Sequence, residues 1–247
     1  GDVPEASVTC YCEPMELIYA ESPITASQLA AERIVEIVSS DPTLRSQRPL
    51  RLAVPGGRSI SPLLGALAAV PFPWDQSVVF LADERVVPDG DPQRNDAQIV
   101  AGLEDAGLAP ASGRPLVVAP PVEPAEPARS ASAYTMELGR FKNALDLIIL
   151  GVGEDGHVAS LFPNSSQTAS QARGYLPVTD SPKPPPQRIT VSPATIQAAR
   201  LVVLLAFGKE KQNARSRIAR AAGTSTALPA SVALGAAHAI LVTDLKP

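Results

Sequence analysis

The chain has 247 residues, 45% of them hydrophobic, and a formal net charge of −4 at pH 7. This composition is typical of a globular protein and excludes a disordered one. The acidic charge argues against a nucleic-acid-binding protein with a broad basic face, but it is compatible with a small basic pocket for one phosphate. No apolar run reaches the roughly 18 residues of a membrane-spanning helix, so we expect no membrane association.

In chain order, hydrophobic periodicity predicts a helix over residues 27–40, a strand over 51–55, a helix over 61–70, a strand over 77–82, a helix within 95–108, a strand over 116–119, a loop over 120–128, a helix over 129–144 and a strand over 146–150. An irregular stretch then extends to about residue 187 and ends in a proline-rich segment. Beyond it we expect a strand over 188–191, a short helix over 193–199, a strand over 201–207, a helix over 209–222 closed by Gly223, and a strand over 238–243.

Short, almost wholly apolar strands that alternate with helices are typical of a parallel sheet buried on both faces. The sequence therefore predicts an α/β fold with an open, mostly parallel sheet and helices on both faces. There is no internal repeat and no strong change in composition along the chain. We expect residues 1–247 to form a single domain.

The N-terminal sequence GDVPEASVTC lacks the basic segment and apolar stretch of a secretory signal, although a removed targeting segment would leave no trace. Cys10 and Cys12 are the two cysteines, and their spacing is unsuited to a strain-free disulfide. We expect two free thiols in a reducing compartment, the cytoplasm. With two histidines and no HExxH motif, we expect neither a metal nor a cofactor.

Polar turns follow four of the predicted strands: GGRS (56–59), DER (83–85), GVGEDGH (151–157) and GKEK (208–211). Ligands bind open parallel sheets beyond the carboxyl ends of the strands, so we expect these turns along one edge. The side chains presented there would be Arg58, Ser59, Asp83, Glu84, Arg85, Asp155, His157 and Lys209. A base, carboxylates and cations beside glycine-rich backbone are suited to an anionic substrate.

The Gly56-Gly57 turn precedes a predicted helix, and its backbone N–H groups could face a phosphate. A tight turn without a ligand explains the same residues equally well. The turn does not match GxxxxGK[ST], so a nucleoside triphosphate is not indicated. Arg188, just after the proline-rich loop, could supply a second cation because its guanidinium binds phosphate through a bidentate fork. Residues 83–85 are the third candidate binding turn, and the alternative for them is an ordinary charged strand end that binds no ligand.

His157 is the candidate base, because a neutral imidazole can take a proton from water near pH 7. Asp155 could orient the ring or stabilise the imidazolium. The alternative is a histidine with only a capping role. GVGEDG matches GxGxxG, but we reject a dinucleotide site because Asp155 would face the pyrophosphate and no long helix follows. His238 opens an apolar strand and is expected to be structural. The GxSxG motif of serine esterases is absent, so in any hydrolysis we expect water, rather than a serine side chain, to attack the substrate directly.

The chain resembles the 6-phosphogluconolactonases of the pentose phosphate pathway. The resemblance rests on GGRS, DERVVPDGDPQRND (83–96), LGVGEDGHVASLFP (150–163), SPKPPPQRIT (181–190), FGKEK (207–211) and LPAS (228–231), which appear in family order. The chain departs from the family pattern on both sides of the glycine pair. Pro55 precedes the pair where family members often carry Ser, and Arg58 follows it where they often carry Ser or Thr.

The resemblance implies a Rossmann-like fold similar to that of glucosamine-6-phosphate deaminases and ribose-5-phosphate isomerases. It implies a metal-free hydrolase of a small sugar-phosphate lactone, in which His157 activates water. The phosphate-binding positions of the family would fall on Gly57, Ser59, Arg85, Arg188 and Lys209. No protein partner is indicated.

Two other functions compete with this prediction. A sugar-phosphate deaminase or isomerase would share the fold and the DGH loop, but such deaminases tend to continue with a Phe-Asn-Glu-Pro type sequence where this chain has VASLFP. A non-catalytic sugar-phosphate sensor would keep the cations and lose the base. The presence of both His157 and Asp155 argues against a sensor.

Overall fold

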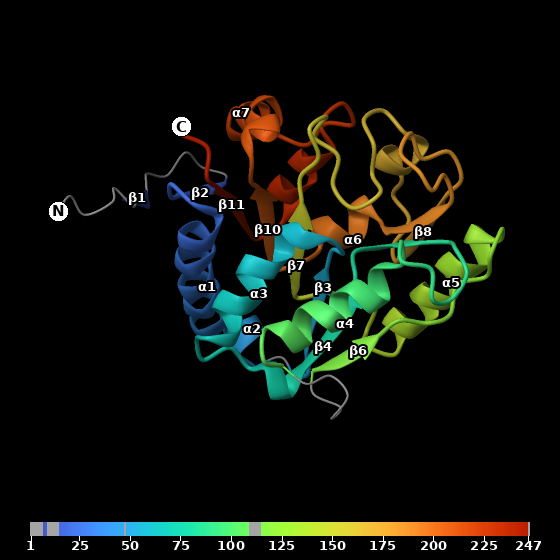
Figure 1. Ribbon diagram of the computed structural model, residues 1–247, viewed down its shortest axis with the longest axis horizontal. Coiled ribbons are helices and arrows are strands. Elements are labelled where there is room, and N and C mark those ends of the chain that lie inside the picture. The colour runs from blue at the N-terminus through green and yellow to red at the C-terminus, as the bar shows by residue number, and fades with distance from the viewer. Residues whose placement is uncertain (1–6, 9–14, 47, 109–114, 247) are drawn as a thin grey trace.

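The structure is a computed structural model that describes residues 7–8, 15–46, 48–108 and 115–246 (Figure 1). Cys10 and Cys12 lie outside the described residues, and so does the side chain of Arg58. No helix in these residues is long and apolar enough to cross a membrane.

A main sheet with the strand order β1-β2-β11-β10-β7-β3-β4-β6 forms the centre of the described molecule. Every neighbouring pair is parallel except β1 with β2. The strands are Ser7–Val8 (β1), Glu16–Tyr19 (β2), Leu50–Val54 (β3), Ser77–Leu81 (β4), Leu116–Val118 (β6), Leu147–Gly151 (β7), Leu201–Ala206 (β10) and His238–Thr243 (β11). All residues of β3, β4 and β10 are buried, because both faces of a parallel sheet are covered. The predicted mostly parallel α/β sheet is confirmed.

Helices flank this sheet (Figure 1). They are Pro23–Ser40 (α1), Pro42–Ser46 (α2), Ser61–Ala68 (α3), Asn95–Asp105 (α4), Pro127–Gly139 (α5), Pro193–Gln197 (α6) and Gln212–Ala219 (α7). Short 3-10 helices cover Arg58–Ile60 (η1), Trp74–Gln76 (η2), Ser166–Ala169 (η4), Lys209–Lys211 (η5) and Pro229–Gly235 (η6). Helices α1, α3 and α4 pack side by side, while η6 packs against α6, β10 and β11.

Helix ends depart from the prediction where local chemistry sets them. Helix α1 begins four residues early, because Ser22 Oγ accepts the N–H of Thr25 and caps the helix. Helix α5 ends at Gly139 rather than at residue 144, because Lys142 and Asn143 adopt positive φ angles. The prediction that Gly223 closes a helix over 209–222 is wrong: its first turn is η5, and α7 ends at Ala219.

A second, antiparallel sheet with the order β5-β9-β8 was not predicted. It consists of Asp83–Arg85 (β5), Arg188–Val191 (β9) and Tyr175–Val178 (β8), so the stretch up to residue 187 is not wholly irregular. The backbone of Ala82 joins the two sheets: its N–H donates to Val54 O at 2.8 Å, and its carbonyl accepts from Val191 N at 2.8 Å. The small sheet therefore stands at the carboxyl ends of β3 and β4.

The order of the central strands places a topological switch between β3 and β7. From β3 the chain proceeds outward to β4 and β6, then returns to β7 on the other side of β3 and continues through β10 to β11. Open parallel sheets bind ligands in a crevice beyond the carboxyl ends of the strands that flank such a switch. The fold therefore favours a ligand site at this position.

Candidate functional site

The four polar turns follow strands that are immediate neighbours in the order β10-β7-β3-β4, so the structure brings them to one edge of the sheet as expected. The turns after β3 and β7 touch at the switch: a Cβ added at Gly151 would lie 3.2 Å from Ser59 Oγ. Ser59 itself is exposed on η1. The glycine-rich turn and the histidine loop therefore meet directly.

Two glycines shape the loop that carries His157. A Cβ at Gly153 would lie 2.0 Å from the ring atoms Cε1 and Nδ1 of His157, so the imidazole packs directly against glycine backbone. Gly156 has a φ of +88°, which L side chains rarely adopt, and its N–H donates to Gly153 O at 3.0 Å. The loop closes where Gly153 N–H donates to His157 O at 2.8 Å. The GxGxxG-like spacing thus serves the placement of the histidine ring.

His157 and Asp155 form a hydrogen-bonded pair. Nδ1 of His157 lies 2.5 Å from Asp155 Oδ1, which also accepts the backbone N–H of His157 at 3.1 Å. Burial lowers the pKa of His157 against the opposing effect of the carboxylate. Burial alone would raise the pKa of Asp155, but the two hydrogen bonds from His157 hold it below its ordinary value. The pair is therefore a neutral imidazole oriented by an ionised carboxylate near pH 7.

Arg188 opens β9 and is buried, with 5% of its surface exposed. Its guanidinium donates to the carbonyl oxygens of Lys183, Pro184 and Pro185 at 2.9–3.0 Å, which ties it to the proline-rich loop. Nη1 lies 3.5 Å from Ser160 Oγ. Burial lowers the pKa of Arg188, and the nearby Arg85 lowers it further while Asp83 raises it. Arg188 is thus a buried cation in the neighbourhood of a second one.

The three residues of β5 have different surroundings. Asp83 is buried, and its carboxylate accepts Ser160 Oγ–H at 2.6 Å and Asn95 Nδ2–H at 3.1 Å. Glu84 is fully buried beneath the first turn of α4, where it accepts the N–H groups of Asn95 and Asp96 at 2.8 and 2.9 Å. Burial raises the pKa of Glu84 although these hydrogen bonds oppose the shift. Glu84 therefore caps a helix and does not reach the surface.

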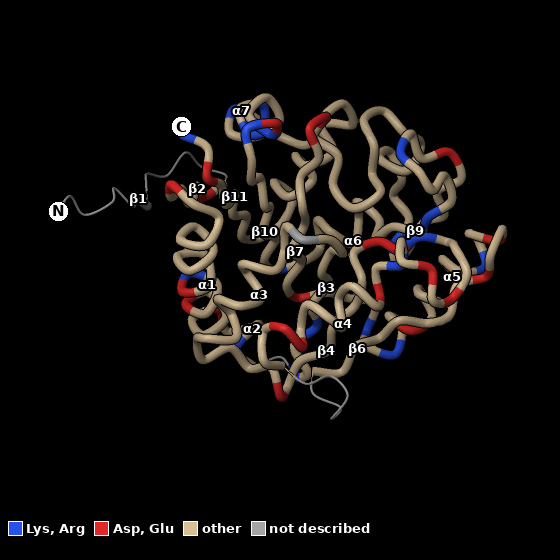
Figure 2. Tube along the Cα trace, viewed as in Figure 1, with Lys and Arg blue, Asp and Glu red and all other residues tan. Residues whose placement is uncertain are grey.

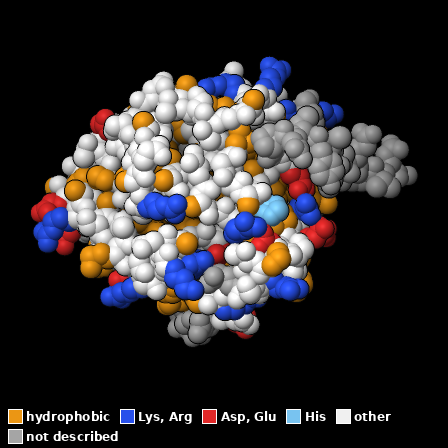
Figure 3. Space-filling model, turned by 180° about the vertical axis from the view of Figure 1, so that it is seen from behind, with side chains coloured by type: hydrophobic (Ala, Val, Ile, Leu, Met, Phe, Trp, Pro, Cys, Tyr) orange, Lys and Arg blue, Asp and Glu red, His pale blue; other side chains and the backbone are white. Residues whose placement is uncertain are grey.

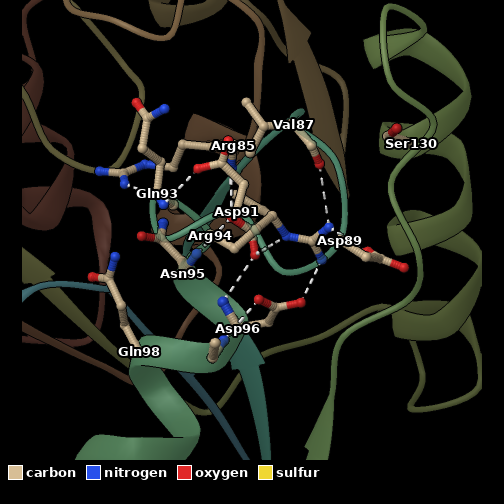
Figure 4. Close-up of polar contacts among 12 residues, drawn as sticks. Arg85, Val87, Asp89, Asp91, Gln93, Arg94, Asn95, Asp96, Gln98 and Ser130 are labelled. Atoms are coloured by element: carbon tan, nitrogen blue, oxygen red, sulfur yellow. Dashed lines mark hydrogen bonds and ion pairs between the residues drawn. The ribbon is translucent and has the colours of Figure 1, made fainter.

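Arg85 leans toward the loop of residues 86–94, where Nη1 donates to Gln93 O at 2.7 Å (Figure 4). Its Nε is buried without a hydrogen-bond partner among the described residues. The loop itself is held by the buried Arg94, whose guanidinium pairs with Asp89 at 2.8 Å and with Asp96, as Figure 4 shows. Arg85 and Arg188 face each other as register partners of β5 and β9.

Two side chains of α4 organise the glycine pair. Asn95 packs so closely on Gly56 that a Cβ there would lie 2.1 Å from Asn95 Oδ1. Gln98 Oε1 accepts the N–H of Gly57 at 3.0 Å, and Gln98 Nε2 donates to Pro92 O at 3.1 Å. The Gly57 N–H that was expected to face a phosphate therefore has an internal partner in this structure.

At the end of β10 the structure separates two lysines. Lys209, the predicted site residue, is exposed. Lys211 is half-buried, and its ammonium group donates to the carbonyl of Val152 in the histidine loop. Burial lowers the pKa of Lys211. Lys211 is therefore the lysine of this turn that lies against the histidine loop.

The prediction missed the side chains that connect the turns, namely Asn95, Gln98, Ser160, Phe162, Lys183 and Lys211. Their signal in the sequence was weak, because most are uncharged polar residues or lie in stretches expected to be loops. All of these positions except 98 fall within the sequence blocks that carry the family resemblance. Reading those blocks residue by residue would have found them.

Charges elsewhere are dispersed. Acidic and basic residues alternate closely around β9 and α5 (Figure 2). Seen from behind, the basic side chains drawn in colour stand singly or in small groups among uncharged atoms (Figure 3). Within the described ranges, no group of three or more His, Cys, Asp or Glu side chains could hold a metal ion.

Comparison with known proteins places this geometry in a family. The family model of glucosamine-6-phosphate isomerases/6-phosphogluconolactonase matches residues 22–242. The chain belongs to this family. It is 33% identical over 244 residues to a 6-phosphogluconolactonase of Streptomyces coelicolor, covering 94% of this chain and 92% of that protein.

Solved structures agree. A 6-phosphogluconolactonase from Thermotoga maritima is similar with a TM-score of 0.72 and 26% identity, covering 93% of this chain and 98% of that one. A 6-phosphogluconolactonase from Trypanosoma cruzi gives a TM-score of 0.75 at 26% identity, covering 93% of each chain. The family and the fold predicted from the sequence are confirmed.

Proposed function

We propose that this chain hydrolyses 6-phospho-D-glucono-1,5-lactone to 6-phospho-D-gluconate, a step of the pentose phosphate pathway, with His157 as general base. The observation that carries the proposal is the His157–Asp155 pair, which stands at the sheet's switch point in a chain whose relatives are 6-phosphogluconolactonases.

We further propose that the described residues form a single domain. One hydrophobic cluster that includes residues from Ile18 to Val242 supports this.

The geometry supports a direct attack by water. With Nδ1–H donated to Asp155, the lone pair of Nε2 accepts a proton as the water oxygen bonds to the lactone carbonyl carbon. Asp155 stabilises the resulting imidazolium. The bond from that carbon to the ring oxygen then breaks, and the proton on His157 passes to the departing oxygen. One water is added, and the imidazole is neutral again.

We assign the phosphate to the cationic side of the same edge. Arg188 and Arg85 would hold it, with Ser59 and the Gly56-Gly57 turn across the crevice and Arg58 close by in sequence. Lys211 is better placed than Lys209 to serve the substrate, because it already lies against the histidine loop. Binding at Gly57 N–H would require Gln98 to release it.

Asp83 and Glu84 fit a positioning role in this proposal. Asp83 offsets the buried charge of Arg188 and anchors Ser160, while Glu84 fixes the first turn of α4. Glu84 is fully buried, so it cannot reach a sugar hydroxyl without giving up these hydrogen bonds. Their roles thus differ from the direct substrate contacts expected from the sequence.

The test is a coupled assay of lactone opening, corrected for spontaneous hydrolysis. His157→Ala should lower kcat about 10²- to 10⁴-fold, since general base catalysis contributes that much. Binding of 6-phosphogluconate should persist. His238→Ala is the matched control, because His238 lies at the amino end of β11, away from the four turns, and should keep wild-type rates. An unchanged rate in His157→Ala would remove His157 as the base.

The same assay series addresses the alternative activity on this fold. Ammonia release from glucosamine 6-phosphate should be absent, because the loop after His157 continues as VASLFP. Turnover of glucosamine 6-phosphate without lactone hydrolysis would replace the proposed function by a deaminase.

A further inference from the structure

Phe162 lies between the candidate base and the candidate phosphate-binding cation. Its ring centroid is 4.8 Å from that of His157, with the two planes tilted by 35°. The guanidinium carbon of Arg188 lies 5.8 Å from the same centroid. His157 and Phe162 belong to the loop after β7, whereas Arg188 begins β9 in the other sheet. One aromatic side chain thus contacts functional groups from two separate parts of the fold.

The ring has little freedom to move. Phe162 is 4% exposed, and its carbonyl accepts the N–H of Ser165 at 3.1 Å. Two residues earlier, Ser160 donates to Asp83 at 2.6 Å and lies 3.5 Å from Arg188 Nη1. The contacts of Ser160 tie the backbone before the ring to β5 and β9, and the Ser165 hydrogen bond closes a turn after it. An aromatic ring held in this way restricts the side chains packed on it more than a flexible aliphatic chain would.

We propose that Phe162 is a positioning residue, which sets the imidazole of His157 and the guanidinium of Arg188 at a fixed separation so that one substrate can engage both. The catalytic meaning of this placement rests on the proposed function. The placement itself concerns two contacts of one ring and can be tested without substrate. Arg over an aromatic face is also stabilised by the ring quadrupole.

The charged groups that face His157 come from four elements. Asp155 lies on its own loop, Asp83 on β5 and Lys183 on the proline-rich loop, and Arg188 lies across Phe162. Both carboxylates raise the pKa of His157, and Lys183 lowers it. Replacing Phe162 removes none of these four charges. A change in the His157 pKa of a Phe162 variant would therefore report the lost ring contact and the increased hydration of the imidazole.

The decisive measurement is an NMR titration of the two histidines in wild type and Phe162→Leu, with resonances assigned from His157→Ala and His238→Ala. Burial holds the pKa of His157 below 6.5, so Phe162→Leu should shift it upward toward 6.5 and leave His238 unchanged. In the lactone assay, kcat/KM should fall about tenfold, with a lower kcat and a higher KM. The acid limb of the pH profile should move to higher pH.

Phe72→Leu is the matched control. Phe72 is equally buried and packs on Trp74, 4.7 Å away, between α3 and β4. It should lose comparable stability without shifting either histidine. If Phe162→Leu does not fold, Phe162→Met, which is similar in volume, is titrated instead.

An unchanged His157 pKa in a folded Phe162 variant would overturn the proposal, even if the wild type hydrolyses the lactone. Conversely, a shifted pKa in a chain that lacks lactone hydrolysis would keep the positioning role and reject the proposed function. The two claims can therefore fail separately.

Discussion

The two ends of the central strands carry buried arginines in opposite situations. At the amino end, Arg51 of β3 and Asp146 before β7 form a buried bidentate pair, with Nη2–Oδ1 and Nε–Oδ2 distances of 2.6 and 2.8 Å. Asp146 also accepts Arg51 N–H, and Arg51 Nη1 donates to Phe141 O. At the carboxyl end, Arg188 is equally buried, yet among the described residues its guanidinium donates to carbonyl and hydroxyl oxygens.

We propose that this difference separates a structural charge from a ligand-binding one. A buried ion pair with every hydrogen bond made holds two strands in register and has nothing left for a ligand. Arg188 has Asp83 nearby but donates no hydrogen bond to a carboxylate among the described residues, so an anionic ligand can bind its guanidinium directly. Arg85 Nε, buried and without a partner among the described residues, reinforces the contrast.

The largest expected effect on stability follows from breaking the buried Arg51–Asp146 pair. Asp146→Ala leaves Arg51 as an uncompensated buried charge and should lower the free energy of unfolding by about 3–5 kcal/mol. Urea denaturation measures this loss. The molecules that remain folded should keep the wild-type KM, because the pair lies at the opposite end of the strands from the four turns.

A surface pair provides the control for that experiment. Arg140 and Glu137 on α5 are 3.2 Å apart, with the Arg140 side chain 72% exposed. Glu137→Ala should change stability by less than about 1 kcal/mol, since exposed ion pairs contribute little. Equal losses in Asp146→Ala and Glu137→Ala would contradict the importance of burial.

A smaller effect is expected at the carboxyl end, where Arg188→Ala removes the candidate phosphate contact. KM should rise about 10- to 100-fold, which corresponds to a charge-assisted hydrogen bond of about 1.5–3 kcal/mol. Arg188→Lys should recover part of this, because it keeps the charge and loses the fork. Steady-state kinetics with Arg129→Ala as an exposed control measures the change. A KM equal to that of the wild type would remove Arg188 from the phosphate site.

The smallest effect concerns Asp41, which pairs with Arg200 at the amino end of β10 and accepts the N–H of Leu44 at 3.1 Å. Burial would raise the pKa of Asp41, but Arg200 and the backbone hydrogen bonds lower it to about 2. Because the folded pKa lies below the unfolded value, the carboxylate stabilises the fold above about pH 4, and this contribution is lost as pH falls through 2.

Asp41 caps the start of α2 through the N–H of Leu44. Asp41→Asn preserves this cap and removes the charge, since Asn and Asp cap helices equally well. It should lower stability at pH 7 by about 0.5–1 kcal/mol, because Arg200 is partly exposed. Thermal unfolding of both proteins between pH 2 and 7 measures the difference, which should shrink toward pH 2. A difference that is the same at every pH would assign the effect to something other than this ionisation.

Much of the fold followed from local patterns. The apolar runs of β10 and β11 were predicted almost to the residue, because strands buried on both faces read as short, continuous apolar runs rich in Val, Ile and Leu. Strand β8, Tyr175–Val178, escaped prediction because it is short, contains proline and lies between loop sequences. The small sheet could not be predicted, since its pairing joins Asp83 to Thr190 across more than a hundred residues.

By itself the sequence determined the class of fold, the family and the edge at which the chemistry gathers, because strand periodicity and strand-end turns are local properties. Only the tertiary structure decided which charged residues are engaged. It placed Glu84 under a helix, set Lys211 rather than Lys209 against the histidine loop, and packed Phe162 between His157 and Arg188. These outcomes depend on packing between distant segments, and no local pattern encodes whether a side chain is already bound by its neighbours.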